Sequence, residues 1–134
     1  MNAVVHPLRV MRRKDLEIAL EKVPRFEDPD PSLEQYPTPA AIAAEIVFDA
    51  YRRGDIAGMK AMDLGCGTGM FSMAAWLMGA GMVVGYDISE KALASARMCA
   101  ECFGADIDFK LSDVKDVCEG ADTVLMNPPF GSQR

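Results

Sequence analysis

The fold is decided by the stretch Met59-Lys60-Ala61-Met62-Asp63-Leu64-Gly65-Cys66-Gly67-Thr68-Gly69, near the middle of the 134-residue chain. Its apolar first half predicts a strand over 59–64, and the alternating glycines then lead into a helix predicted over 69–78. Glycine lets a ligand approach the backbone where any Cβ would collide, although tight packing between a strand and a helix also favours glycine. This stretch therefore predicts the first strand, turn and helix of an α/β unit.

Strands and helices alternate in the residues that follow. We expect strands over 82–86, 107–111 and 123–126, and a helix over 90–103. Repeats of strand, helix and strand build a parallel sheet with right-handed crossovers and helices on both faces. The predicted fold class is therefore α/β, with a mostly parallel sheet in the core, residues 59–134.

The residues before this core predict added helices. Leu16, Leu20 and Val23 share one face of an amphipathic helix over 11–23, which needs a core to pack against. Residues 24–37 are rich in proline and acid and predict an extended connection. Thr38 and Pro39 are typical of a helix N-cap and first turn, and Gly54 of its end. Residues 1–54 are thus a helical extension within one domain, residues 1–134.

Composition limits the class of protein. Half of the residues are apolar, which argues against disorder, and no apolar run approaches the ~20 residues of a membrane span. Charges near the N-terminus replace the apolar core of a signal peptide, so we expect a cytoplasmic protein. The net charge of −6 argues against tight independent binding to RNA. Residues 1–25 are basic; they are either a nucleic-acid contact or a solvated helix face.

The cysteines, Cys66, Cys99, Cys102 and Cys118, show no disulfide framework. Cys99 and Cys102 have the spacing of zinc ligands, but zinc needs four ligands and the only histidine, His6, lies in the N-terminal tail. We therefore expect two buried helix cysteines and no structural metal.

The glycine turn has an acidic partner. Asp87 ends the second predicted strand, where a carboxylate can accept hydrogen bonds from both hydroxyls of a ribose. The glycines are not followed by the Lys-Ser/Thr of a P-loop, and Asp63 just before them repels phosphate. Asp63 instead suits an ammonium group, such as the amino-acid end of S-adenosylmethionine. Asp113, after the third strand, either accepts a hydrogen bond from an adenine amino group or simply caps a turn.

The last strand runs into Asn127-Pro128-Pro129-Phe130. Proline cannot donate to a sheet ladder, so the strand must end here. The tetrapeptide offers an amide, free carbonyls and an aromatic face, which together suit a planar group bearing NH2. The structural alternative is a Pro-Pro turn with Phe130 folded into the core.

Taken in order, these motifs resemble those of the Rossmann-like class I methyltransferases that use S-adenosylmethionine to methylate exocyclic amino groups. Further similarity lies in Leu33-Glu34-Gln35-Tyr36-Pro37-Thr38, in Leu77-Met78-Gly79-Ala80-Gly81 and in Gly131. These stretches are similar to the archaeal and eukaryotic small-subunit ribosomal RNA N6-adenosine methyltransferases. The resemblance implies methyl transfer to the N6 amino group of an adenosine in RNA, with S-adenosylmethionine as cofactor.

The resemblance also implies a role for each matching residue. The implied cofactor contacts are Gln35, Thr38, Asp63, Gly65, Cys66, Gly67, Asp87, Ile88, Asp113, Val114 and Asn127. The implied catalytic residues, which hold the target base, are Asn127, Pro128, Pro129 and Phe130.

The family binds a small zinc-containing activator protein, generally at the edge of the third strand, here 107–111. Its members also continue well past the Asn-Pro-Pro-Phe motif. The resemblance therefore implies that C-terminal strands are missing after Arg134. The fourth strand, 123–126, is then an exposed apolar edge that invites pairing between two copies.

Two other functions remain open. The Asn-Pro-Pro-aromatic grip also fits a protein glutamine or a DNA adenine methyltransferase, although Gln35-Tyr36-Pro37-Thr38 argues against both. The third possibility is a non-catalytic module that binds S-adenosylmethionine or a partner.

Overall fold

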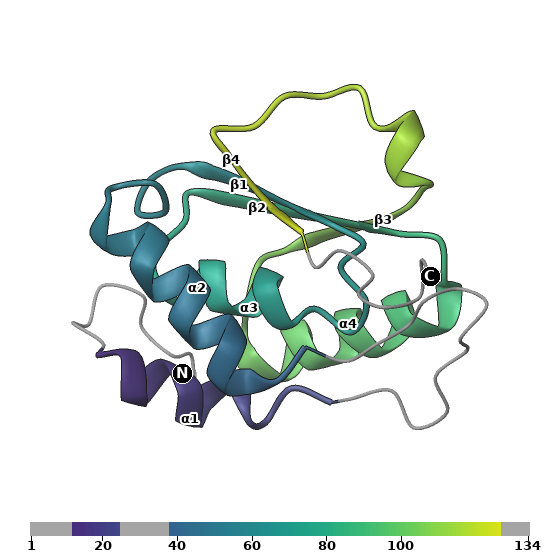
Figure 1. Ribbon diagram of the computed structural model, residues 1–134. Coiled ribbons are helices and arrows are strands. Elements are labelled where there is room, and N and C mark those ends of the chain that lie inside the picture. The colour runs from purple at the N-terminus through teal and green to yellow at the C-terminus, as the bar shows by residue number, and fades with distance from the viewer. Residues whose placement is uncertain (1–11, 25–37, 127–134) are drawn as a thin grey trace, which may run out of the picture.

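A parallel sheet of four strands organises the fold, which the computed structural model describes for residues 12–24 and 38–126 (Figure 1). The strands are β1 (Lys60–Leu64), β2 (Met82–Asp87), β3 (Asp108–Leu111) and β4 (Thr123–Met126). Their order across the sheet is β3-β2-β1-β4, and every pair is parallel. The predicted strands and the α/β fold class are confirmed, and no strand end differs from its predicted position by more than one residue.

The α-helices are α1 (Arg13–Leu20), α2 (Ala40–Arg52), α3 (Met70–Leu77) and α4 (Glu90–Phe103). A short 3-10 helix, η2 (Val114–Asp116), lies between β3 and β4. Local sequence explains α4 well. The Ser89 hydroxyl accepts a hydrogen bond from the Ala92 N–H at 3.1 Å, and Gly104 ends the helix in the left-handed region. At α2 the prediction was one residue early, because Pro39 rather than Thr38 is the N-cap.

Strand alternation sorts the core into two sets of side chains. Ala61, Val83 and Leu125 point to the side of the helices and join the large apolar core. The predicted amphipathic α1 packs against α2 and α3, with Leu16 and Leu20 fully buried. Nearly all of α3 is buried, because it lies between the sheet and these N-terminal helices.

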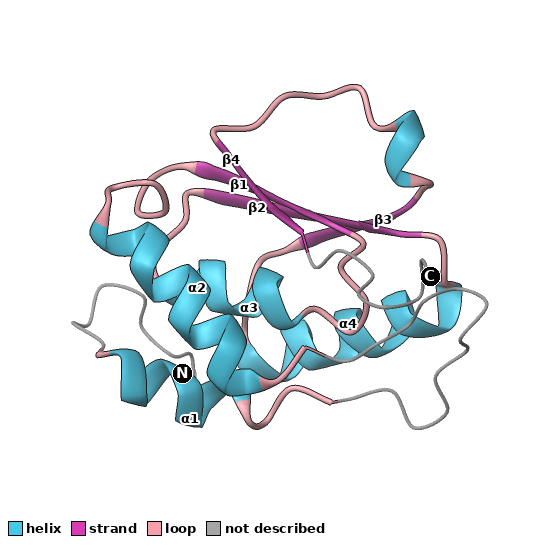
Figure 2. Cartoon of the chain, in the orientation of Figure 1, coloured by secondary structure: helices cyan, strands magenta, loops and turns pink. Residues whose placement is uncertain are grey.

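The opposite face of the sheet corrects one expectation. We expected helices on both faces, but the four α-helices of the described residues lie on one face (Figure 2). The other face carries residues 112–122 with η2, which pack over a small cluster of Met62, Val84 and Tyr86. This connection must cross from β3 at one edge to β4 at the other, so too few residues remain for a longer helix.

Ionic contacts fasten this connection to the sheet. The Glu119 carboxylate bridges the Lys60 ammonium at 2.8 Å and the Lys110 ammonium at 3.4 Å. Asp122 accepts a hydrogen bond from the Lys60 N–H at 2.9 Å and returns one to its carbonyl at 3.0 Å. The chain is thereby guided into β4 next to the start of β1.

Within the described residues β4 pairs only with β1, and Val124 and Met126 remain 53% and 47% exposed. The expected apolar edge is therefore present in this part of the chain. None of the described helices combines the length and apolarity needed to cross a bilayer.

Candidate functional site

The candidate site lies where β1, β2 and β4 end. From β1 the chain crosses to β2 on one side, whereas β4 pairs with β1 on the other side. Such a reversal of strand order opens a crevice at the carboxyl ends of the strands, where α/β sheets bind ligands. The register places Leu64 of β1 beside Met126 of β4, so the chain leaves both strands at the same level.

The glycine turn after β1 is anchored by its backbone. The N–H groups of Gly65 and Cys66 both donate to the Tyr86 carbonyl, each at 2.8 Å. Gly65 has a φ of 73°, and a Cβ built on it would meet no atom within 4 Å. Gly65 is therefore required for its backbone conformation, and the space beside it is open for a ligand.

Gly69 also needs a left-handed backbone, with a φ of 96°, but it has no open space beside it. A Cβ on Gly69 would lie 3.3 Å from the ring of Phe109 and 3.4 Å from the Ala96 Cβ. The two explanations of the glycine turn thus apply to different residues of the same turn.

Asp87 fastens this turn to β2. One carboxylate oxygen accepts a hydrogen bond from the Gly67 N–H at 2.8 Å, and the other accepts one from the Ser89 N–H at 2.9 Å. Asp87 is half-buried, so each oxygen can accept a further hydrogen bond from a hydroxyl group. Sequence analysis proposed the ribose contact for Asp87 but missed its second task of holding the turn.

Asp63 carries a carboxyl group that is buried in the core. It belongs to the set of side chains that face the helices, and it is only 1% exposed. Burial raises its pKa to about 7, although hydrogen bonding from Ser72 lowers it and the charge of Asp87 raises it further. The Ser72 hydroxyl donates to the Asp63 carboxylate at 2.7 Å.

Sequence analysis also missed Ser72. The only signal available was a serine in the first turn of an otherwise apolar helix, directly after the glycine turn. Cys66 lies beside the same carboxylate, and burial raises the pKa of its thiol, so that it stays neutral.

Apolar side chains lie on the other side of the crevice, after β2 and β3. Ile88 is 49% exposed and Val114 is 38% exposed, so both present apolar surface to solvent. Leu111, at the end of β3, is exposed in the same way and was not predicted. Asp113 caps η2 by accepting a hydrogen bond from the Lys115 N–H at 3.1 Å, so its turn-capping role is confirmed. The adenine contact of Asp113 stays a prediction.

Several predicted residues lie outside the described part of the chain. They are Gln35, Asn127, Pro128, Pro129 and Phe130. Thr38 is described, half-buried just before α2.

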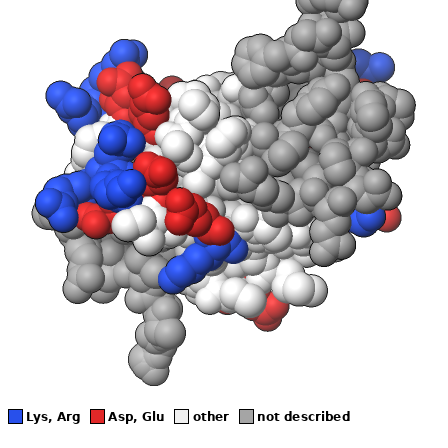
Figure 3. All heavy atoms as spheres, turned by 60° about the horizontal axis from the view of Figure 1, so that its bottom comes forward, with Lys and Arg blue, Asp and Glu red and all other residues white. Residues whose placement is uncertain are grey.

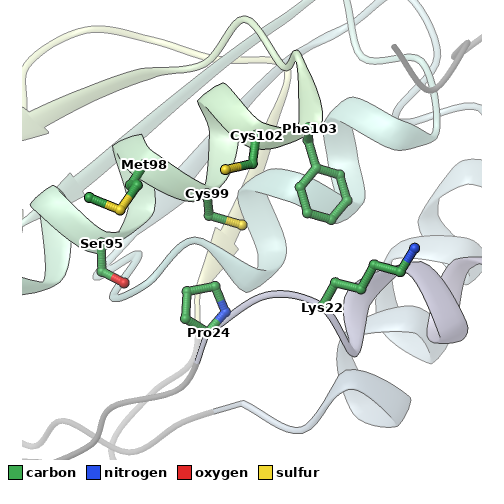
Figure 4. A pocket seen from close by; sticks show the side chains of 7 residues that line it. All are labelled: Lys22, Pro24, Ser95, Met98, Cys99, Cys102 and Phe103. Carbon is green, nitrogen blue, oxygen red and sulfur yellow. The ribbon is translucent and has the colours of Figure 1, made fainter. Parts of the chain in front are cut away.

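A separate cavity of about 560 Å³ lies between α4 and the end of α1 (Figure 4). Ser95, Met98, Cys99 and Cys102 line its α4 side, and none of the glycine-turn residues borders it. Cys99 is buried as expected, but Cys102 is exposed, which corrects the expectation of two buried cysteines. Cys102 falls about 60° outside the arc of α4 that faces the core. In residues 12–24 and 38–126 no three histidine, cysteine or acidic side chains are placed to hold a metal ion.

Basic and acidic side chains are interspersed on the face of the molecule shown in Figure 3. Described pairs on the N-terminal helices include Arg13 with Glu17 at 3.6 Å and Arg53 with Asp49 at 2.7 Å. The described residues on this face therefore form no large patch of one sign that would attract a polyanion by itself.

Comparison with known proteins agrees with this geometry. A family model described as a methyltransferase domain matches residues 55–130. The chain is 40% identical, over 129 residues, to rRNA N(6)-adenosine-methyltransferase METTL5 of Danio rerio, covering 92% of this chain and 62% of that protein. Curated relatives of this kind are thus matched over about three-fifths of their length.

Solved structures show the same fold. The RNA methyltransferase candidate PH1948 of Pyrococcus horikoshii superimposes with a TM-score of 0.85 at 40% identity, covering 94% of this chain and 63% of that one. Magnesium protoporphyrin IX methyltransferase of Synechocystis, solved with S-adenosylhomocysteine bound, gives a TM-score of 0.60 at 30% identity over 63% of this chain and 40% of that one. The Rossmann-like class I fold is therefore shown, and the comparisons support S-adenosylmethionine as the cofactor of the fold.

Proposed function

The chain belongs to the methyltransferase-domain family, and from this premise we propose that it transfers the methyl group of S-adenosylmethionine to the N6 amino group of an adenosine in RNA. The substrate class follows the ribosomal RNA methyltransferases to which the chain is similar, and small-subunit ribosomal RNA is the proposed substrate. The single observation that carries the proposal is the glycine turn after β1, which Asp87 fastens to β2 at the edge of the sheet where the parallel strands end.

The cofactor would occupy the crevice along the ends of β1, β2 and β3. Asp63 would face its ammonium group, the open space at Gly65 its methionine part, and Asp87 its ribose. Ile88 and Val114, both exposed, would lie against the adenine. Bound there, the cofactor supplies an electrophilic methyl group on a sulfonium centre.

The target base would be held by the residues that follow β4. Asn127 is the next residue after Met126, and Met126 lies beside the residue that precedes the glycine turn. Met126, the last described residue, therefore lies at the level where the cofactor's methionine part would lie.

The amino nitrogen of adenine is a poor nucleophile because its lone pair is delocalised into the ring. We propose that the Asn127 side-chain oxygen and the Pro128 carbonyl each accept a hydrogen bond from one N–H group of this amine. These two bonds would aim its lone pair at the methyl group. Phe130 would stack on the unpaired base. The amine loses its proton readily once it is methylated, so this mechanism needs no dedicated general base.

Asn127→Ala should abolish methyl transfer and leave binding of S-adenosylhomocysteine, measured by calorimetry, within about threefold of wild type, because the base loses its hydrogen-bond acceptor whereas the cofactor loses only one of its many implied contacts. The transfer assay uses labelled S-adenosylmethionine and small-subunit ribosomal RNA, followed by nucleoside analysis. Transfer by the variant at the wild-type rate would contradict this mechanism.

A protein partner at β3 is part of the proposal. In the described residues β3 pairs only with β2, and the Ser112 N–H donates to the Asp87 carbonyl at 2.9 Å. Strand alternation then turns the Phe109 carbonyl to the open side, where the Arg97 guanidinium donates to it at 2.9 Å. A small zinc-containing activator that adds a strand here would displace Arg97 from this carbonyl.

The open edge of β4 offers a second contact, through which two copies of the chain could pair. The transfer assay is therefore run with and without the activator, and the mass of the chain is measured by light scattering. Label on N6-methyladenosine supports the proposed activity. If parallel assays with protein or DNA as the substrate place the label on glutamine or on DNA adenine instead, that activity would replace the proposed one. Binding of the cofactor without transfer under every condition would indicate a cofactor-binding module.

A further inference from the structure

Asp63 and Ser72 form a closed pair below the candidate cofactor site. The serine is 0% exposed and the aspartate 1%, and the hydroxyl donates to the carboxylate at 2.7 Å. They come from different elements, since Asp63 lies in β1 and Ser72 in the first turn of α3. The glycine turn that joins these elements therefore fixes the pair in place.

We propose that Ser72 is a positioning residue for the amino-acid end of the cofactor, because its hydroxyl holds the buried Asp63 carboxylate and favours the ionised form, which attracts an ammonium group. This inference rests on the proposed function and assigns a role to a residue that makes no contact with the reacting atoms.

The surroundings of Asp63 give it little other help. Its neighbours in the sheet register are Gly85 of β2 and Leu125 of β4, neither of which carries a charge. Asp87, at the end of β2, repels a negative charge on Asp63, and the Cys66 thiol is neutral. Burial and Asp87 both raise the pKa of Asp63, whereas the lowering contributions come from Ser72, through its hydroxyl and its backbone.

The consequence for the ligand follows from proton linkage. An ammonium group binds well to ionised Asp63 and poorly to the neutral acid. Below the pKa of Asp63 in the free protein, which is about 7, cofactor affinity should fall about tenfold for each pH unit. Removing the hydroxyl raises this pKa, so the pH profile of affinity should move to higher pH.

The test measures the affinity of S-adenosylhomocysteine by calorimetry from pH 5.5 to 8.5 for the wild type, Ser72→Ala and Ser95→Ala. The control variant removes the same hydroxyl from α4, beside the separate cavity. A hydrogen bond to a charged group is worth about one pKa unit or more, so Ser72→Ala should bind about tenfold more weakly below neutral pH. Its affinity should approach that of the wild type at the alkaline end, and Ser95→Ala should follow the wild type throughout.

Because all proteins are compared with one ligand at each pH, titration of the ligand's own amino group cancels. A loss of affinity by the same factor at every pH would mean that Ser72 acts only in packing, and this result would overturn the inference. An unchanged affinity would overturn it as well.

A second variant keeps the inference testable if Ser72→Ala does not fold. Asp63→Asn cannot ionise, so relative to the wild type it should lose the steep pH dependence and bind weakly throughout. If Asp63→Asn keeps the wild-type profile, the ionised carboxylate is not what the ligand senses. Absence of binding by the wild type at every pH would instead refute the proposed function, and the inference with it.

Discussion

Asp63 should make the free protein less stable at neutral pH than it is in acid, and Asp63→Asn should remove this effect. The pKa of the buried carboxyl is raised from 3.8 to about 7 in the folded chain. A raised carboxyl pKa means that the folded state holds its proton more tightly than the unfolded state does. The contribution to stability is therefore complete below pH 3.8 and is lost as the pH rises through 7.

The size of the effect follows from the two pKa values. Between pH 4.5 and pH 7 the unfolded state is largely ionised while the folded state keeps most of its proton. Proton linkage over this interval lowers the free energy of unfolding of the wild type by about 3 kcal/mol relative to a chain without the group. A change of this size is a large part of the stability of a small domain.

The assay is urea unfolding of the wild type, Asp63→Asn and the exposed control Asp106→Asn at pH values from 4.5 to 7. Differences between variants cancel the titration of all other groups, and they separate the pH-dependent effect from any constant cost of packing the amide. The advantage of Asp63→Asn over the wild type should grow by about 3 kcal/mol across this range, and that of Asp106→Asn should stay flat. A difference for Asp63→Asn that does not change with pH would refute the assignment of Asp63 as a buried, destabilised carboxyl.

Three further variants probe the same region. Gly85→Ala places a Cβ 2.9 Å from the ring of Phe109, so thermal unfolding should show a loss of roughly 1–3 kcal/mol through overpacking. Asp87→Asn removes a charged acceptor from the Gly67 N–H and should weaken S-adenosylhomocysteine binding by about tenfold or more in calorimetry. Glu119→Gln breaks two ion pairs over the sheet, and because its side chain is 32% exposed, unfolding in urea should change by no more than about 1 kcal/mol and less in high salt.

The strands and the glycine turn were predictable because their signals are local. An apolar strand followed by alternating glycines specifies its own geometry, and α4 carries both a serine cap and a terminal glycine.

The features that were missed depend on contacts between distant residues. The connection over 112–122 was not recognised as the layer covering the second face, since its attachment depends on the Lys60 and Lys110 contacts of Glu119. The exposure of Cys102 follows from the angle at which α4 meets the core, which its sequence does not fix by itself. Ser72 was missed because a serine within an apolar helix gains its meaning only from the carboxylate that it faces.

Asp63, inside β1, and Asp87, at the end of the neighbouring strand β2, differ in the partners that the fold gives to their carboxylates. Each Asp87 carboxylate oxygen already accepts a hydrogen bond from a backbone N–H, so a ribose would add to acceptors that have partners. Asp63 receives help from Ser72 alone and carries a raised pKa, so its charge still lacks a partner. An incoming ammonium group would supply that partner. The amino-acid end of the cofactor should therefore contribute more to affinity than the ribose. The same unpartnered charge on Asp63 lowers the stability of the free protein at neutral pH, and binding of the ammonium group would remove this cost.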